Sequence, residues 1–183
     1  VYLKSKPKTK HLFQENKVEK LLKHYGDLLP YPVLLTGSDE VPRQINHGIA
    51  PFEKPFDDTD EAREALLSFG EKEFNEEFLT SIPLRISSTK SAGVAYVLKK
   101  TPSLANKPEN KVYLKRMLLS DENRDILPDW SFSVKAIINT NELRPTASRE
   151  AFYQDDKLAR VRKQMGRCIR NYLVQLHQTD SAL

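Results

Sequence analysis

The sequence predicts an α/β fold, an α+β sandwich in which helices cover a mixed sheet and a long C-terminal helix follows. The first observation is a block of β-branched and aromatic runs between residues 82 and 138, which are typical of strands. The second is the helical spacing of apolar residues on both sides of that block. The third is size, because 183 residues with 39% hydrophobic content suffice for one substantial core. Strands flanked by helices indicate layers packed around that core.

The N-terminal part of the chain is expected to hold a helix, a short strand and a loop. From residue 16 to residue 29 apolar side chains recur at helical spacing, and Pro30 and Pro32 close the run. A short strand is expected at residues 33–35. Residues 37–58 contain three prolines, two glycines and scattered charge without periodicity. We therefore predict a long mobile loop there.

A second helix is predicted after this loop. Asp58 followed by Glu61 resembles a capping box, in which side chains satisfy the free backbone amides of the first helical turn. Apolar residues continue at helical spacing, and Phe74 and Phe78 extend the pattern beyond Gly70. The pattern begins with Ala62, Ala65, Leu66 and Phe69.

The centre of the chain is predicted to form the sheet. Four runs alternate or are continuously apolar and are rich in β-branched and aromatic residues. They span residues 82–86, 93–98, 112–119 and 132–138. The turn-like segment DENRDILPD precedes the last run. We expect these strands to pair in one mixed sheet.

A long helix is predicted after residue 150, because apolar side chains return there to one helical face. The members of this stripe are Leu158, Val161, Met165, Cys168, Ile169, Tyr172, Leu173 and Leu176. The stripe is expected to pack inward. Cys168 has no histidine or acid at a suggestive spacing, so we interpret it as a small buried hydrophobe rather than a nucleophile.

Composition bounds the environment of the chain. No stretch approaches the roughly 18 apolar residues that a membrane-spanning helix needs, so no membrane partner is expected. A single cysteine excludes an internal disulfide and is typical of a reducing compartment, for which the cytoplasm is our prediction. The chain opens with Val1 and lacks an apolar signal segment, and its first ten residues resemble a strand end and a basic turn. We therefore expect an excerpt from a longer polypeptide.

No self-contained active site is visible in the sequence. A phosphate-binding P-loop, a dinucleotide-binding glycine motif and a zinc-protease helix are all missing, and the four histidines are scattered without metal spacing. We therefore predict no cofactor and no metal within this chain. The sequence indicates a binding module or one part of a divided enzyme.

Charge is balanced overall but concentrated locally. The net charge is +4, from 29 basic and 25 acidic residues, which indicates a mixed surface rather than a polycation. One segment of the C-terminal helix is dense in cations: Arg160, Arg162, Lys163, Arg167 and Arg170. That density is explained either by a solvated face or by a patch for a polyanion or an acidic partner.

Arg149 poses a specific question, because NELRPTASRE places it beside Glu150 at the expected start of the long helix. A cation in the first turn opposes the positive end of the helix dipole, at roughly 0.3–1 kcal/mol when exposed. One interpretation is an ion pair with Glu150 or with Asp155. The other is a functional role that offsets this cost.

The second half of the chain resembles the middle segment of the 90-kDa heat-shock chaperones, whose bacterial members are called high-temperature protein G. The resemblance rests on a strand motif, an L-P-acid-aromatic turn and an S-R-E signature before a helix. These are supplied by Lys111, Val112, Tyr113, Leu114, Lys115 and Arg116; by Leu127, Pro128, Asp129 and Trp130; and by Ser148, Arg149 and Glu150. The helix leading into LLPYPVLL is similar to the helix that precedes the family's Y-P strand.

The resemblance implies a sandwich related to the second domain of ribosomal protein S5. Residues 1–183 would be a middle-domain fragment, with the sandwich at 1–145 and a catalytic loop and long helix at 146–183. The N-terminal ATP-binding and C-terminal dimerisation domains would be absent. Arg149 would contact the terminal phosphate of ATP in the parent protein, supported by Ser148 and Glu150.

The resemblance also implies partners. These would be client proteins, the ATP-binding domain of the same chain with ATP and Mg, and a second copy in a homodimer. The fragment is not expected to hydrolyse ATP by itself. The alternative is a nucleic-acid-binding module with an S5-like fold and an arginine-rich helix, although nucleic acid is not the expected partner.

One departure from the family pattern lies close to the signature. The glutamine that commonly follows the signature glutamate by three residues falls on Tyr153, and Gln154 comes one place later. Whether Tyr153 or Gln154 contributes to the nucleotide site is left open by the sequence.

Overall fold

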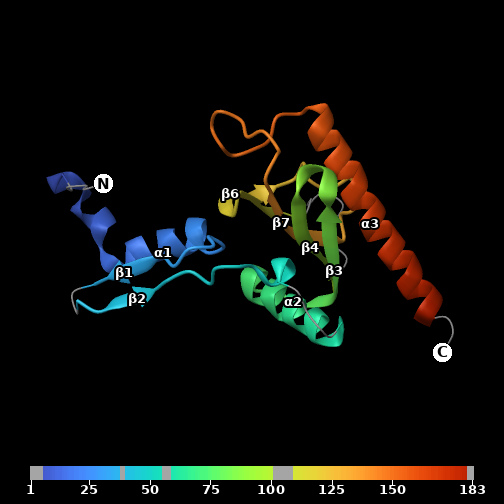
Figure 1. The fold of residues 1–183 in the computed structure, drawn as a ribbon, viewed down its shortest axis with the longest axis horizontal. Coiled ribbons are helices and arrows are strands. Elements are labelled where there is room, and N and C mark those ends of the chain that lie inside the picture. The colour runs from blue at the N-terminus through green and yellow to red at the C-terminus, as the bar shows by residue number, and fades with distance from the viewer. Residues whose placement is uncertain (1–5, 38–39, 55–58, 101–108, 181–183) are drawn as a thin grey trace. The chain divides into compact units, whose positions relative to one another are not determined.

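The computed structural model describes residues 6–37, 40–54, 59–100 and 109–180. The chain divides into two compact units, Val1–Ala50 with Arg116–Leu118 and Pro51–Lys115 with Leu119–Leu183. Figure 1 shows the helices and strands that the two units contain. Within the described residues no helix is both long enough and apolar enough to span a bilayer.

The first unit combines two helices with a small hairpin. A 3-10 helix, η1 (Pro7–Phe13), precedes α1 (Glu15–Gly26), and β1 (Leu34–Thr36) pairs antiparallel with β2 (Pro42–Gln44). The helix predicted over residues 16–29 is confirmed, with an earlier end. The strand end and basic turn predicted for the first ten residues are wrong at residues 7–10, which belong to η1, while residues 1–5 lie outside the described residues.

Residues 37–58 are more regular than the sequence predicts. They contribute strand β2 and the 3-10 helix η2 (Pro51–Glu53), so the prediction of an irregular loop is wrong there. Buried Asn46 organises the return of the chain, because its side chain accepts from Val33 N–H at 2.8 Å and donates to the carbonyls of Leu29 and Tyr31, both at 2.9 Å. These long-range bonds are invisible to a periodicity argument. The mobility of the segment stays a prediction, and residues 38–39 and 55–58, including the predicted cap Asp58, lie outside the described residues.

The second unit contains the predicted mixed sheet. The strands of this sheet are β3 (Phe78–Ile86), β4 (Ser91–Leu98), β5 (Asn110–Leu114), β6 (Met117–Asn123) and β7 (Val134–Thr140), and of these only Met117 and Leu118 of β6 are grouped with the first unit. Their order across the sheet is β3-β4-β7-β5-β6 (Figure 1). The β3–β4 and β4–β7 pairs are antiparallel, whereas β5 and β7 are parallel. The predicted mixed α/β architecture is thus confirmed.

Two strand predictions need correction. Residues 112–119 form no single strand, because the chain reverses between β5 and β6 at Lys115 and Arg116, whose φ angles are 51° and 68°. Two consecutive left-handed residues are typical of the tightest hairpin turns, which usually carry Asn and Gly. The other correction concerns Phe78, which begins β3 and is not part of the preceding helix.

The helices α2 (Thr59–Phe74) and α3 (Asp156–Asp180) cover opposite faces of the sheet. Successive strand residues point to opposite faces, so neighbours in β4 identify the two layers. Ala95 belongs to the core cluster under α3, whereas a Cβ at Gly70 of α2 would overlap the ring of Tyr96. The second unit is therefore a three-layer sandwich.

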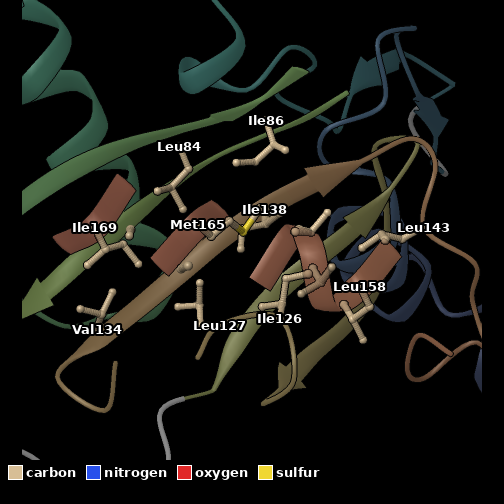
Figure 2. Packing of buried hydrophobic residues seen from close by; sticks show 14 of the residues in the cluster. Leu84, Ile86, Ile126, Leu127, Val134, Ile138, Leu143, Leu158, Met165 and Ile169 are labelled. Atoms are coloured by element: carbon tan, nitrogen blue, oxygen red, sulfur yellow. The ribbon is translucent and has the colours of Figure 1, made fainter. Parts of the chain in front are cut away.

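The stripe predicted on α3 forms the centre of this core. Figure 2 shows Leu158, Met165 and Ile169 of α3 among buried residues of the sheet and the following loop. Cys168, Tyr172 and Leu173 are partly buried and pack against the same cluster, so these three members of the predicted stripe do face the core. Leu176 is 39% exposed, so the prediction that it points inward is wrong.

The layer under α2 contains an unsatisfied polar atom. Tyr96 is fully buried and packs on Phe74 and Phe78, and its hydroxyl has no hydrogen-bond partner among the described residues. Burial, with a smaller contribution from the charge of Glu73, raises the pKa of this hydroxyl above the ordinary 10.0. The folded state therefore disfavours the phenolate strongly.

Replacing Tyr96 with phenylalanine should stabilise the fold by about 1 kcal/mol at neutral pH, because it removes an unpaired buried donor. Above pH 10.0 the unfolded tyrosine ionises while the folded one stays neutral, so native stability of the unsubstituted chain falls as pH rises. The Tyr96→Phe advantage should therefore widen above pH 10. Urea denaturation of both chains at pH 7 and pH 10.5 measures it, and an equal or lower stability of the variant would contradict the unsatisfied hydroxyl.

Candidate functional site

Arg149 lies at the tip of a short two-stranded ribbon between β7 and α3, which we call the arginine ribbon and define as residues 144–153. Leu143 and Phe152 are buried in the core cluster and anchor its base. Pro145 and Phe152 form an antiparallel β-bridge, and Tyr153 N–H donates to the Arg144 carbonyl at 3.0 Å. The ribbon is thus tied to the core at both ends.

The tip of the ribbon is a hydrogen-bonded turn. Thr146 N–H donates to the Ala151 carbonyl at 2.9 Å, and Arg149 N–H donates to the Thr146 carbonyl at 3.0 Å. The hydroxyls of Thr146 and Ser148 lie 3.1 Å apart. A turn followed by one left-handed residue is a common hairpin design, and glycine usually takes the left-handed place.

Here that place is taken by Arg149, with φ 59°. A non-glycine residue held in the left-handed region costs about 1 kcal/mol or more, and such residues cluster at functional sites. The strain is local, because the turn hydrogen bonds and the buried base of the ribbon impose the conformation.

The expected position of Arg149 in the first turn of the long helix is wrong. α3 begins at Asp156, and Asp155 caps it by accepting from Lys157 N–H at 3.0 Å and Leu158 N–H at 2.9 Å. The predicted opposition between Arg149 and the helix dipole therefore does not arise. The unfavourable feature of Arg149 is instead its left-handed backbone conformation.

The side chain of Arg149 is exposed, and it makes no ion pair or hydrogen bond with any residue that the structure describes. The proposed pair with Glu150 or Asp155 is absent, since Asp155 serves as the helix cap and Glu150 is exposed without an ion pair to a described residue. The supporting role of Ser148 and Glu150 stays a prediction. Of the two, Ser148 is the one that stabilises the turn.

The residues flanking the tip have other contacts. The Arg144 guanidinium lies 5.4 Å from the centre of the Tyr153 ring, close enough for a cation–π interaction. Gln154 donates to Asp125 at 3.2 Å and accepts from Arg162 at 3.3 Å. Tyr153 and Gln154 therefore support the ribbon, and neither bonds to Arg149 here.

The sequence did not single out Arg144. Its contact with Tyr153 requires the chain to fold back on itself across the ribbon, and the two residues are nine places apart. Along the chain, only the turn-forming residues between Arg144 and Tyr153 indicate that the segment folds back. The ribbon thus presents one stacked arginine at its base and, at its tip, one arginine whose side chain has no partner among the described residues.

This arrangement suits recognition of an anion outside the chain. A guanidinium has five N–H donors in a planar fork that matches phosphate oxygens, and it stays charged at any physiological pH. Among the described residues no group of three or more His, Cys, Asp or Glu could hold a metal ion. The arginine ribbon can therefore contribute one oriented positive charge to a site completed by other groups.

Replacing Arg149 with glycine should raise the stability of the isolated chain by about 1 kcal/mol, because glycine adopts the left-handed conformation without strain. Arg149→Ala keeps the strain and removes the same side chain, so its stability should stay within about 0.5 kcal/mol of the original. Guanidinium denaturation distinguishes the two. A glycine variant no more stable than the alanine variant would contradict the claim that the backbone at Arg149 is strained.

The chain is similar to known proteins over most of its length. The family model described as Hsp90 protein matches residues 94–182, which include the whole arginine ribbon. Chaperone protein HtpG of Geobacter metallireducens is 23% identical over 206 residues, covering 99% of this chain and 32% of the relative. Chaperone protein HtpG of Sulfurovum sp. is 25% identical over 185 residues, covering 89% of this chain and 30% of the relative.

A third relative, Chaperone protein HtpG of Helicobacter pylori, is 25% identical over 177 residues and covers 86% of this chain. The chain spans about a third of the length of the first two curated relatives. The chain is therefore similar to the Hsp90 protein family over residues 94–182 and to HtpG chaperones over most of its length, as the motifs ending in Ser148, Arg149 and Glu150 predict.

Proposed function

We propose that this chain acts as the middle segment of an ATP-dependent chaperone. In this role Arg149 contacts the terminal phosphate of an ATP molecule held by an N-terminal domain, and the three-layer sandwich serves as the rigid base from which the arginine ribbon extends. Client proteins are the partners on which the chaperone acts, and the parent is a homodimer. The similarity to HtpG proteins supports the chaperone part of this proposal.

The observation that carries the proposal is an exposed arginine without a partner among the described residues, held at a strained ribbon tip. An arginine that served stability would be expected to make an ion pair or to pack its stem. A strained backbone conformation is kept where the surrounding structure imposes it, and at such positions function commonly explains it. Both features are consistent with a side chain whose partner lies in another domain.

The chemistry assigned to Arg149 is charge stabilisation. During phosphoryl transfer negative charge shifts among the oxygens of the terminal phosphate, and a guanidinium can donate two parallel hydrogen bonds to them. The nucleotide, its Mg ion and the attacking water would be held by the ATP-binding domain. The contribution of this chain would be the position and the permanent charge of one arginine.

The proposal predicts that activity depends on joining the two parts. The isolated chain should show no saturable heat with Mg-ATP and no turnover, because it brings one phosphate ligand and not a pocket. A polypeptide that joins it to an ATP-binding domain from an HtpG relative should hydrolyse ATP faster than that domain alone. Calorimetry and steady-state turnover test this. Micromolar ATP affinity of the isolated chain, or no gain on joining, would overturn the division of labour.

A further inference from the structure

A groove with an apolar floor lies between α3 and the loop that precedes β7. Its volume is about 740 Å³, within the size range of ligand sites in proteins. The floor is formed by Pro128, Trp130, Ala159 and Gly166. Trp130 is the largest of these side chains and is 49% exposed, so the groove presents an accessible aromatic edge.

Gly166 makes the groove possible. It lies in the middle of α3, where glycine is less favourable than alanine. A Cβ at this position would lie 2.8 Å from Cγ of Pro128 and 3.2 Å from Cζ2 of Trp130, closer than side chains normally approach. The missing side chain allows the Pro128–Trp130 loop to lie against the helix with the tryptophan edge open.

The rim of the groove is strongly basic. Lys163, Arg167 and Arg170 line it from α3, all three are exposed, and none forms an ion pair with a described residue. Arg162 also lines the groove, but its guanidinium is held by the Asp125 carbonyl at 2.6 Å and by Gln154. Three cations therefore face the groove without a neutralising carboxylate from the part of the chain that the structure describes.

We propose that this groove binds an acidic peptide segment, with one apolar side chain on the tryptophan floor and flanking carboxylates on the rim cations. Carboxylates accept hydrogen bonds from Arg and Lys at the rim, while removal of an apolar side chain from water favours binding at the floor. The occupant is a segment of another protein. The proposal does not rest on the role of Arg149, which lies on the arginine ribbon and not among the lining residues.

The floor favours a peptide over a nucleic acid. Proteins that hold single-stranded nucleic acid stack successive bases on several aromatic side chains along a basic groove. Among the described residues Trp130 is the only aromatic side chain that lines the groove, and the other uncharged lining residues, Pro128, Ala159 and Gly166, are small and apolar. A single anchor for one apolar side chain fits this floor better than a stacking platform.

The test uses the fluorescence of Trp130, which is the only tryptophan of the chain and reports directly on the groove. The 183-residue chain is titrated with a synthetic peptide that has one leucine between runs of glutamate, and in parallel with its lysine counterpart and with a single-stranded DNA oligonucleotide of equal charge. The acidic peptide should shift the emission to the blue saturably and bind at least tenfold tighter than either alternative. Its affinity should fall as salt is raised.

Matched charge reversals on α3 locate the site. Arg167→Glu/Arg170→Glu should lower the affinity for the acidic peptide at least tenfold. Lys157→Glu/Arg160→Glu makes the same charge change on the same helix outside the groove. This control should change the affinity less than about threefold. Thermal melts check that both variants fold, and Arg167→Gln/Arg170→Gln should give an intermediate loss. The proposal is overturned if the emission does not saturate, if both reversals weaken binding equally, or if the oligonucleotide binds as tightly as the peptide.

Discussion

Arg149→Ala, in a polypeptide that joins this chain to an ATP-binding domain, should lower ATP turnover by up to about 10³-fold while nucleotide affinity stays nearly unchanged. Arginines supplied from a neighbouring domain contribute roughly 10³–10⁵ in phosphoryl-transfer rate. We expect an effect at or below the lower end, because the arginine ribbon has to dock before the guanidinium can act. Affinity is spared because the side chain acts mainly where charge shifts in the transition state.

Arg149→Lys should restore turnover only in part, because an ammonium group is a point charge and cannot reproduce the planar fork. Arg144→Ala is the matched control, since it removes an arginine from the same ribbon whose guanidinium is stacked on Tyr153. It should change turnover far less than Arg149→Ala. If the role of Arg149 is only structural, Arg149→Ala will keep its turnover and lose at most about 1 kcal/mol of stability.

The largest loss of stability is expected from Met165→Ala. Met165 is fully buried in the core cluster between α3 and the sheet, and removing such a side chain typically destabilises a protein by about 2–5 kcal/mol, through lost burial and the cavity that remains. Arg160→Ala is the control, because Arg160 is exposed on the same helix. It should change the free energy of unfolding by less than about 0.5 kcal/mol. Urea denaturation gives both values.

A loss below about 1 kcal/mol at Met165 would contradict its central place in the core. The slope of the unfolding free energy against urea concentration should stay unchanged, because the amount of surface exposed on unfolding should stay the same. A changed slope would mean that the substitution has altered the unfolded state or broken the cooperativity of unfolding.

The layers of the second unit could be predicted because their signals are local. The stripe on α3 and the β-branched runs of the sheet follow from spacing along the chain, and Met165 and Ile138 are buried as that spacing indicates. The reversal at Lys115 and Arg116 could not be predicted, because both residues are left-handed and neither is the Gly or Asn that usually marks such a turn.

The sequence singles out Arg149, whose role stays a prediction, but it does not give the geometry of this residue. The S-R-E signature singled out Arg149, yet its left-handed conformation depends on the pairing of Pro145 with Phe152, which no local pattern reveals. The start of α3 was placed too early, although Asp155 carries an ordinary capping signal. The groove beside Trp130 requires Gly166 to meet Pro128 across the fold, so only the structure could show it.

The most direct test of the central claim is a structure of the joined polypeptide with a non-hydrolysable ATP analogue. The account predicts that guanidinium nitrogens of Arg149 lie about 3 Å from oxygens of the terminal phosphate, with the arginine ribbon docked on the ATP-binding domain. A docked ribbon in which Arg149 pairs with a protein carboxylate and leaves the terminal phosphate untouched would contradict it.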